Sequence, residues 1–228
     1  MRPVARGPAP QVYTKYGDAI DDLVARMGRY CSYCERRLPT SLAVEHMAPK
    51  KHHPSMELDW DNFLLGCTNC NSVKTDNDLN DDELVWPDRD NTLRAFDYRQ
   101  GGFVRVSEAI DDAIRQRAEN LAELVGLDRH PANGWPQPTK KDKRWLQREE
   151  IWTEAERCRD IYVAVDDKSA ALKLLVCAAE GYGFFSVWFE VFSEHEEVRR
   201  ALIDAFPGTP ADCFDADATP IARPGGVI

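Results

Sequence analysis

Two Cys-x-x-Cys pairs constrain this chain more than any other feature of its sequence. They are Cys31/Cys34 and Cys67/Cys70, and 32 residues separate them. Each pair presents two sulfurs on one tight turn, and together they supply the four thiolates that zinc favours. The alternative is a set of unrelated core cysteines or a redox pair, but a paired pattern at both ends of one segment rarely arises by accident. The spacing therefore predicts a structural zinc site that stabilises a segment with few periodic apolar residues.

The rest of the composition is that of an ordinary folded protein. The chain has 228 residues, of which 43% are hydrophobic and 10% aromatic, which is enough for a core and excludes a disordered or coiled-coil chain. The longest apolar stretch, 170–192, is interrupted by Lys173 and Glu180, so no membrane segment is expected. The first residues lack the apolar run of a signal peptide, and we expect a cytoplasmic protein. The single cysteines, Cys158, Cys177 and Cys213, are expected in the core.

The charge is distributed unevenly along the chain. The net charge is −10, and residues 151–228 carry 14 acidic against 7 basic side chains. Residues 29–76 are balanced, with six of each sign. A net-negative surface does not capture nucleic acid by bulk attraction. If the first half binds a polyanion, it needs a cation or a partner.

Composition and periodicity divide the chain into four segments. Residues 1–28 read as a loose, proline-rich arm followed by a short helix, and 29–76 as the cysteine-rich module. Residues 77–106 read as an acidic loop and a hairpin with strands at 94–98 and 103–106. The last segment, 107–228, is mainly helical.

Apolar residues at helical spacing predict five helices in that last segment. A capping-box pattern, Ser193-x-x-Glu196, is expected to open the final one. The other four are expected from Ser107 to about Val125, from Thr139 to about Tyr162, from Ser169 to Glu180, and over 184–192.

Between and beside the cysteine pairs stand residues that suit metal and acid–base chemistry. Glu45 and His46 are adjacent, Asn62 precedes the second pair, and Asn71 follows Cys70 directly. Carboxylate and amide oxygens suit Mg²⁺ or Mn²⁺. A neutral imidazole beside such an ion can take a proton from water. A lone histidine is usually structural, but His46 lies inside the cysteine frame beside an acid.

These motifs resemble those of a zinc-containing HNH endonuclease. They read Tyr30-Cys-Ser-Tyr-Cys34, Glu45-His-Met-Ala-Pro-Lys50 and Cys67-Thr-Asn-Cys-Asn-Ser-Val-Lys74. They are most similar to the nuclease subunits of Septu-type and retron-associated anti-phage systems. The resemblance implies an α+β fold: a small zinc-stapled ββα-metal module, followed by a mainly α-helical C-terminal part. Its strands should begin near Ala43 and Phe63, and its helix near Thr68.

The resemblance also implies a role for each matched residue. His46 corresponds to the general base, and Glu45 to the acidic residue that helps to hold the catalytic metal. Asn62 corresponds to the asparagine that ties the loop between the strands and orients the histidine. Asn71 stands where many members have a metal-binding histidine, so the catalytic Mg²⁺ or Mn²⁺ should be bound less tightly here.

Lysines complete the expected site, since Lys74 could contact a phosphate oxygen, and so could Lys50 or Lys51.

The function indicated is metal-dependent cleavage of DNA, as the effector of a bacterial anti-phage defence system. Two alternatives stay open: an RNA-cutting toxin on the same scaffold, and a non-catalytic zinc module that binds nucleic acid or protein. The joint presence of Glu45, His46 and Asn62 favours the enzyme. The acidic helical region, 107–228, is expected to dock on a protein partner such as a defence ATPase.

Overall fold

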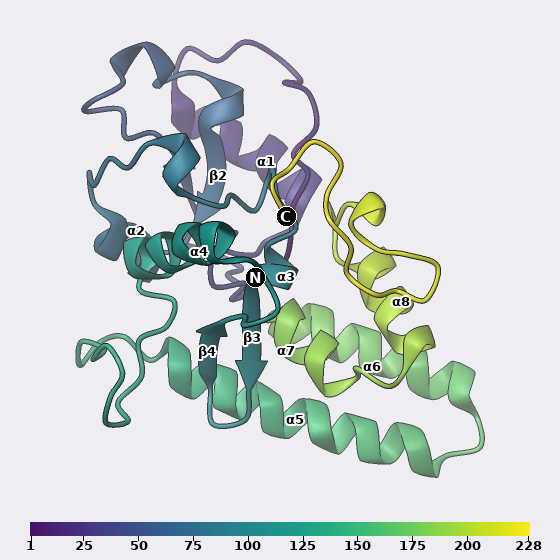
Figure 1. Ribbon diagram of the computed structural model, residues 1–228. Coiled ribbons are helices and arrows are strands. Elements are labelled where there is room, and N and C mark those ends of the chain that lie inside the picture. The colour runs from purple at the N-terminus through teal and green to yellow at the C-terminus, as the bar shows by residue number, and fades with distance from the viewer.

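The computed structural model describes residues 1–228, with the cysteine-rich module at one end of the molecule and the long helices at the other (Figure 1). The N-terminal part begins with the short 3-10 helix η1 (Tyr16–Ala19) and the helix α1 (Ile20–Met27). One continuous core of 52 buried residues runs through both ends. The module therefore shares its core with the rest of the chain.

The cysteine-rich module is a ββα unit. Strand β1 (Ala43–His46) pairs antiparallel with β2 (Phe63–Gly66), so that His46 lies opposite Phe63. Helix α2 (Thr68–Lys74) follows, and the Cys67 thiol caps it by accepting a hydrogen bond from the backbone N–H of Cys70. These bounds agree with the expected ones, and the predicted α+β fold class is confirmed.

A hairpin joins the module to the helices. Its strands are β3 (Phe96–Arg99) and β4 (Phe103–Val106), as the alternation predicts, although β3 begins two residues later than expected. The reason is that α3 (Thr92–Ala95) occupies the start of that range as a single helical turn.

The remaining chain is helical, and α5 runs along one edge of the molecule beneath the hairpin, with α6 and α7 packed against it (Figure 1). None of the helices is both long and apolar enough to cross a bilayer. The bounds are α4 (Asp112–Val125), α5 (Arg144–Ala164), α6 (Lys168–Tyr182), α7 (Phe185–Val191) and α8 (Glu196–Ala205).

Four details of these helices differ from the sequence-based prediction. Helix α6 continues through Gly181 to Tyr182 instead of ending at Glu180. Helix α4 starts at Asp112 because the Asp111 side chain caps it, and α5 starts at Arg144 rather than at Thr139. The predicted capping box at Ser193 is wrong, because His195 is the N-cap residue of α8 and makes no side-chain capping bond.

The expectation of a loose N-terminal arm is also wrong. Met1, Arg2, Val4 and Arg6 are buried. The Arg2 guanidinium donates hydrogen bonds to the carbonyls of Met27, Phe206 and Pro207, which come from the C-terminal ends of α1 and α8. The polar head of an arginine thus fixes a stretch whose prolines suggested mobility.

Glu35 joins the cysteine-rich module to the helical part. Its buried carboxylate accepts hydrogen bonds from the backbone N–H and the hydroxyl of Ser186, at 2.7 and 2.5 Å, and from the Arg2 N–H. The Glu35 carbonyl also accepts from the Phe184 N–H. The turn that carries Cys31 and Cys34 is therefore bonded directly to the start of α7.

The single cysteines are only partly as expected. Cys213 is buried, but Cys158 is half-buried and Cys177 is exposed on α6. The apolar neighbours of Cys177 in sequence do not all face the core, because α6 is covered on one side only.

Candidate functional site

The four paired cysteines lie together and suit a zinc ion. All four are buried, and their sulfur atoms lie within 4.8 Å of one another. The Cys31 and Cys70 sulfurs are 3.7 Å apart, and those of Cys34 and Cys67 are 3.6 Å apart. Zinc–sulfur bonds of about 2.3 Å in a tetrahedron require separations of about 3.8 Å. The cluster is therefore placed to hold a structural zinc.

Two arginines border this cluster, although no sequence motif connects them with it. Arg144 donates to the Cys70 sulfur at 3.1 Å, and half-buried Arg36 lies beside Cys34 and Cys67. Burial alone would lower the pKa of Arg144, but the Cys70 thiolate and Asp142 raise it overall. Four thiolates around one Zn²⁺ leave two negative charges, which these two guanidinium groups offset.

Beside the cluster, β1, α2 and the loop after β1 enclose a cleft of about 380 Å³, which we call the Glu45–His46 cleft. In Figure 1, α2 lies near the end of β2. The lining of the cleft includes Tyr16, Glu45, His46, Lys50, Asn71 and Lys74.

Glu45 and Asn71 both lie against Gly66. A methyl group at Gly66 would lie 3.1 Å from Asn71 Oδ1 and 3.1 Å from Glu45 Cβ. The bare glycine therefore leaves room beside the Asn71 amide oxygen and the first side-chain carbon of Glu45. A carboxylate and an amide oxygen fit a hard divalent cation such as Mg²⁺ or Mn²⁺. Gly66 was missed in the sequence, where nothing marks it as part of the site.

A backbone carbonyl and two aromatic rings hold the His46 side chain in place. Its Nε2 lies 2.9 Å from the Glu57 carbonyl oxygen. The rings of Tyr16 and Phe63 contact it edge-on, with centroids 5.0 and 5.2 Å away. Burial lowers the pKa of His46, and the positive charges of Lys50 and Lys74 act in the same direction. The neutral imidazole is thereby favoured.

Lys74 is placed differently from the expected phosphate contact. Its ammonium is 2% exposed, lies 3.0 Å from Glu45 Oε1 and donates to the His46 carbonyl at 2.7 Å. Burial raises the pKa of Glu45, while the charge of Lys74 opposes that rise. In this structure Lys74 thus holds the two residues of β1 in place and does not face solvent.

Lys50 and Lys51 are the accessible lysines of the cleft, and Lys51 pairs with Asp76. Lys50 is 44% exposed, its Nζ lies 4.1 Å from the Tyr16 ring centroid, and Glu57 Oε1 is 3.5 Å away. Tyr16, which comes from η1, was also missed, because no motif connects it with the module.

Asn62 bonds to the loop between the two strands of the module. Its Oδ1 accepts from the Ala48 N–H at 2.7 Å, and its Nδ2 donates to the carbonyls of Ala48 and Met56 at 2.9 and 3.2 Å. Met56 directly precedes Glu57, whose carbonyl contacts His46. All three hydrogen bonds of the Asn62 side chain therefore hold the loop that orients the imidazole.

Comparison with known proteins agrees with this geometry. The family model described as HNH endonuclease matches residues 31–77. The Septu protein PtuB of Bacillus thuringiensis is 34% identical over 74 residues. That alignment covers 30% of this chain and 29% of the length of PtuB, so the similarity spans less than a third of either protein. The predicted resemblance is confirmed, since residues 31–77 match the HNH endonuclease family model and the alignment with PtuB agrees with it.

Proposed function

We propose that this protein is a metal-dependent endonuclease that cleaves DNA phosphodiester bonds with His46 as general base. The observation that carries the proposal is that Glu45, His46 and Asn71 line one cleft within the matched module. Glu45 and Asn71 would hold Mg²⁺ or Mn²⁺. When bound, that ion supplies positive charge against the reacting phosphate and the leaving oxygen.

The contact of His46 with Glu57 specifies which ring nitrogen can act. A carbonyl oxygen only accepts hydrogen bonds, so Nε2 at 2.9 Å carries the ring proton and donates it. The lone pair of neutral imidazole is then on Nδ1. The Nδ1 atom can accept a proton from the attacking water, and the lowered pKa keeps it free to do so near neutral pH.

The residues around His46 have different supporting roles. Exposed Lys50 can contact a phosphate oxygen, whereas buried Lys74 orients the Glu45 carboxylate. Asn71 is a neutral ligand, so retention of the metal depends strongly on Glu45 and on the substrate phosphate.

A role in anti-phage defence, in the cytoplasm and with a protein partner, belongs to the same proposal. The similarity to a Septu protein supports the defence role. A second surface supports a partner: a mostly apolar groove of about 370 Å³ lies between α5 and α6, and Ile161 and Leu174 on it are 61% and 73% exposed. Such a patch on a soluble surface marks an interaction site. An ATPase docked there would bring the nuclease under control.

The test is cleavage by His46→Ala in Mg²⁺ or Mn²⁺. We expect zinc content and folding to stay as in the wild type, while the cleavage rate falls by about 10²–10⁴-fold. Parallel assays on plasmid DNA and on RNA of the same sequence separate the DNA nuclease from the RNA nuclease. Near-full activity of the variant contradicts the base assignment, and wild-type protein without activity on either substrate favours the non-catalytic zinc module.

A further inference from the structure

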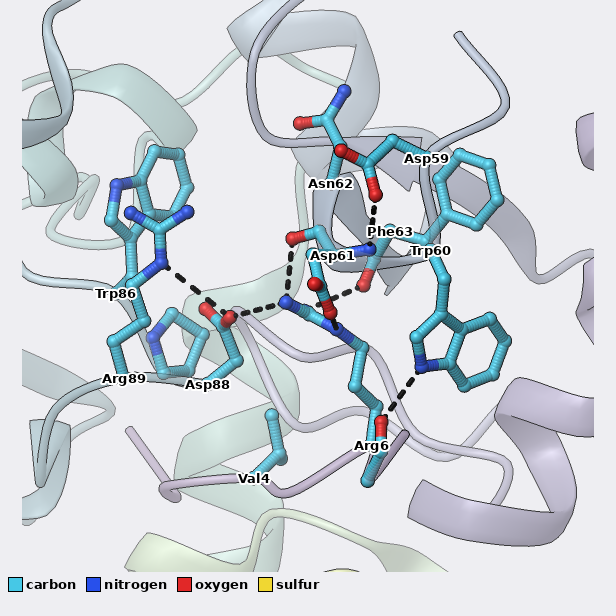
Figure 2. Close-up of polar contacts among 12 residues, drawn as sticks. Val4, Arg6, Asp59, Trp60, Asp61, Asn62, Phe63, Trp86, Asp88 and Arg89 are labelled. Carbon is cyan, nitrogen blue, oxygen red and sulfur yellow. Dashed lines mark hydrogen bonds and ion pairs between the residues drawn. The ribbon is translucent and has the colours of Figure 1, made fainter. Parts of the chain in front are cut away.

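Arg6 makes buried polar contacts that the proposed reaction does not use. Its guanidinium is 9% exposed, and Nη2 lies 2.9 Å from Asp88 Oδ2. Nη1 donates to the Phe63 carbonyl at 3.0 Å, and Nη2 donates to the Asp61 carbonyl at 2.5 Å. Figure 2 shows the group lying between Asp88 and the turn that carries residues 61–63.

The two carbonyls that Arg6 binds belong to the residues on either side of Asn62. A guanidinium is a planar fork, so binding both carbonyls fixes the backbone of the turn. The Asn62 amide points to the opposite side of the turn from Arg6 (Figure 2), where it bonds to Ala48 and Met56.

The same turn contacts His46 from two directions. Phe63 pairs with His46 across the sheet, and their rings lie 5.2 Å apart. Through Met56, Asn62 also holds the loop whose next residue, Glu57, binds His46 Nε2. Arg6 therefore anchors both the strand partner and the loop that set the orientation of the imidazole.

We infer that Arg6, with its charge balanced by Asp88, is a positioning residue for His46. Its effect on the rate rests on the proposed function, whereas its effect on the site's geometry does not. Other bonds hold this N-terminal segment in place without Arg6: Trp60 Nε1 donates to the Gly7 carbonyl at 2.8 Å, and the Val4 N–H donates to Pro87. A change at Arg6 should thus loosen the turn without releasing the segment.

Arg6→Lys tests the inference, because it keeps the charge but cannot bridge both carbonyls in the plane of a fork. We expect kcat to fall about 10–100-fold with KM within about twofold of the wild type, since misplacing a reacting group affects the chemical step. Arg99→Lys is the matched control, because Arg99 is exposed on β3 and pairs with Asp97. Wild-type kcat in Arg6→Lys overturns the inference.

A spectroscopic readout separates this inference from the proposed function. In ¹⁵N-labelled full-length protein, Arg6→Lys should shift the Asn62 side-chain amide and His46 imidazole resonances, and Arg99→Lys should leave them unchanged. If the wild-type protein has no nuclease activity, these resonances alone decide: shifted signals support positioning, and unshifted signals overturn it.

Should the lysine variant fold poorly, Arg6→Met combined with Asp88→Leu removes both buried charges together. The folded double variant is expected to show the same loss of kcat and the same shifts, and wild-type values in it overturn the inference.

Discussion

The four-cysteine cluster and the Glu45–His46 cleft lie in the same ββα module. Only the cluster is enclosed entirely by groups of the protein. The cluster is fully buried, and its sulfurs accept hydrogen bonds from the backbone of Cys67 and Cys70 and from Arg144. The cleft is open, and its Lys50 side chain is 44% exposed.

This difference follows from what each site has to do. A structural zinc site uses all four positions for protein ligands, whereas a catalytic site keeps positions open for water and substrate. Changes in the cluster should therefore be seen first in folding, and changes in the cleft first in activity.

The largest expected effect is that of Cys67→Ser. It removes one zinc ligand, while the serine hydroxyl can still cap α2, so we expect loss of the bound zinc and, with it, unfolding of the module. Zinc content by elemental analysis and the circular dichroism melting curve measure this. Cys177→Ser is the control, because Cys177 is exposed and should change neither. A folded, zinc-free Cys67→Ser protein with full activity would show that the cluster is not structural.

A smaller effect on stability is expected for Arg144→Met. Asp142 would lose its buried partner at 2.6 Å, and Cys70 would lose its donor, which costs about 3–5 kcal/mol of unfolding free energy. Zinc transfer to a chromogenic chelator should also become faster. Arg157→Met is the matched control on the same helix, since Arg157 is 68% exposed. If the two variants have equal unfolding free energies and equal rates of zinc release, Arg144 does not stabilise the cluster.

In the cleft, Gly66→Ala should lower activity while leaving the fold intact. The added methyl group would meet Asn71 Oδ1 and Glu45 Cβ at 3.1 Å, which forces a shift of a few tenths of an ångström. We expect about a tenfold loss of cleavage rate and a raised Mg²⁺ requirement, because misplaced groups slow the chemical step. Gly17→Ala, which adds its methyl group in open space, should behave as the wild type. If Gly66→Ala shows the same Mg²⁺ dependence as the wild type, Glu45 and Asn71 do not bind the metal.

The smallest effect is expected for Lys50→Gln, measured in the inactive His46→Ala background. Losing one phosphate contact should weaken DNA binding and reduce the slope of log K against log salt by about 0.9. Lys173→Gln on α6 lies outside the cleft and should leave the slope unchanged. If the two variants give the same slope, Lys50 does not contact phosphate.

Local patterns predicted the elements of the module and most of the helices. The bounds of β1, β2 and α2 agree with those that the family resemblance implies, and the four cysteines lie together as their spacing predicts. The predictions were wrong where a contact with a residue distant in sequence overrode the local pattern. The N-terminal arm is buried because Arg2 binds carbonyls around position 207, and no local pattern encodes that contact.

The sequence by itself determined the four-cysteine cluster and the residues of the module, because cysteine spacing and short motifs are local information. Only the tertiary structure decided that Lys74 is buried against Glu45 and that Arg144 reaches Cys70, 74 positions away. It also decided that Arg6 holds the turn around Asn62. These arginines and lysines would be solvated in an extended chain, and their roles exist only where folding buries them against carbonyl, carboxylate and thiolate partners.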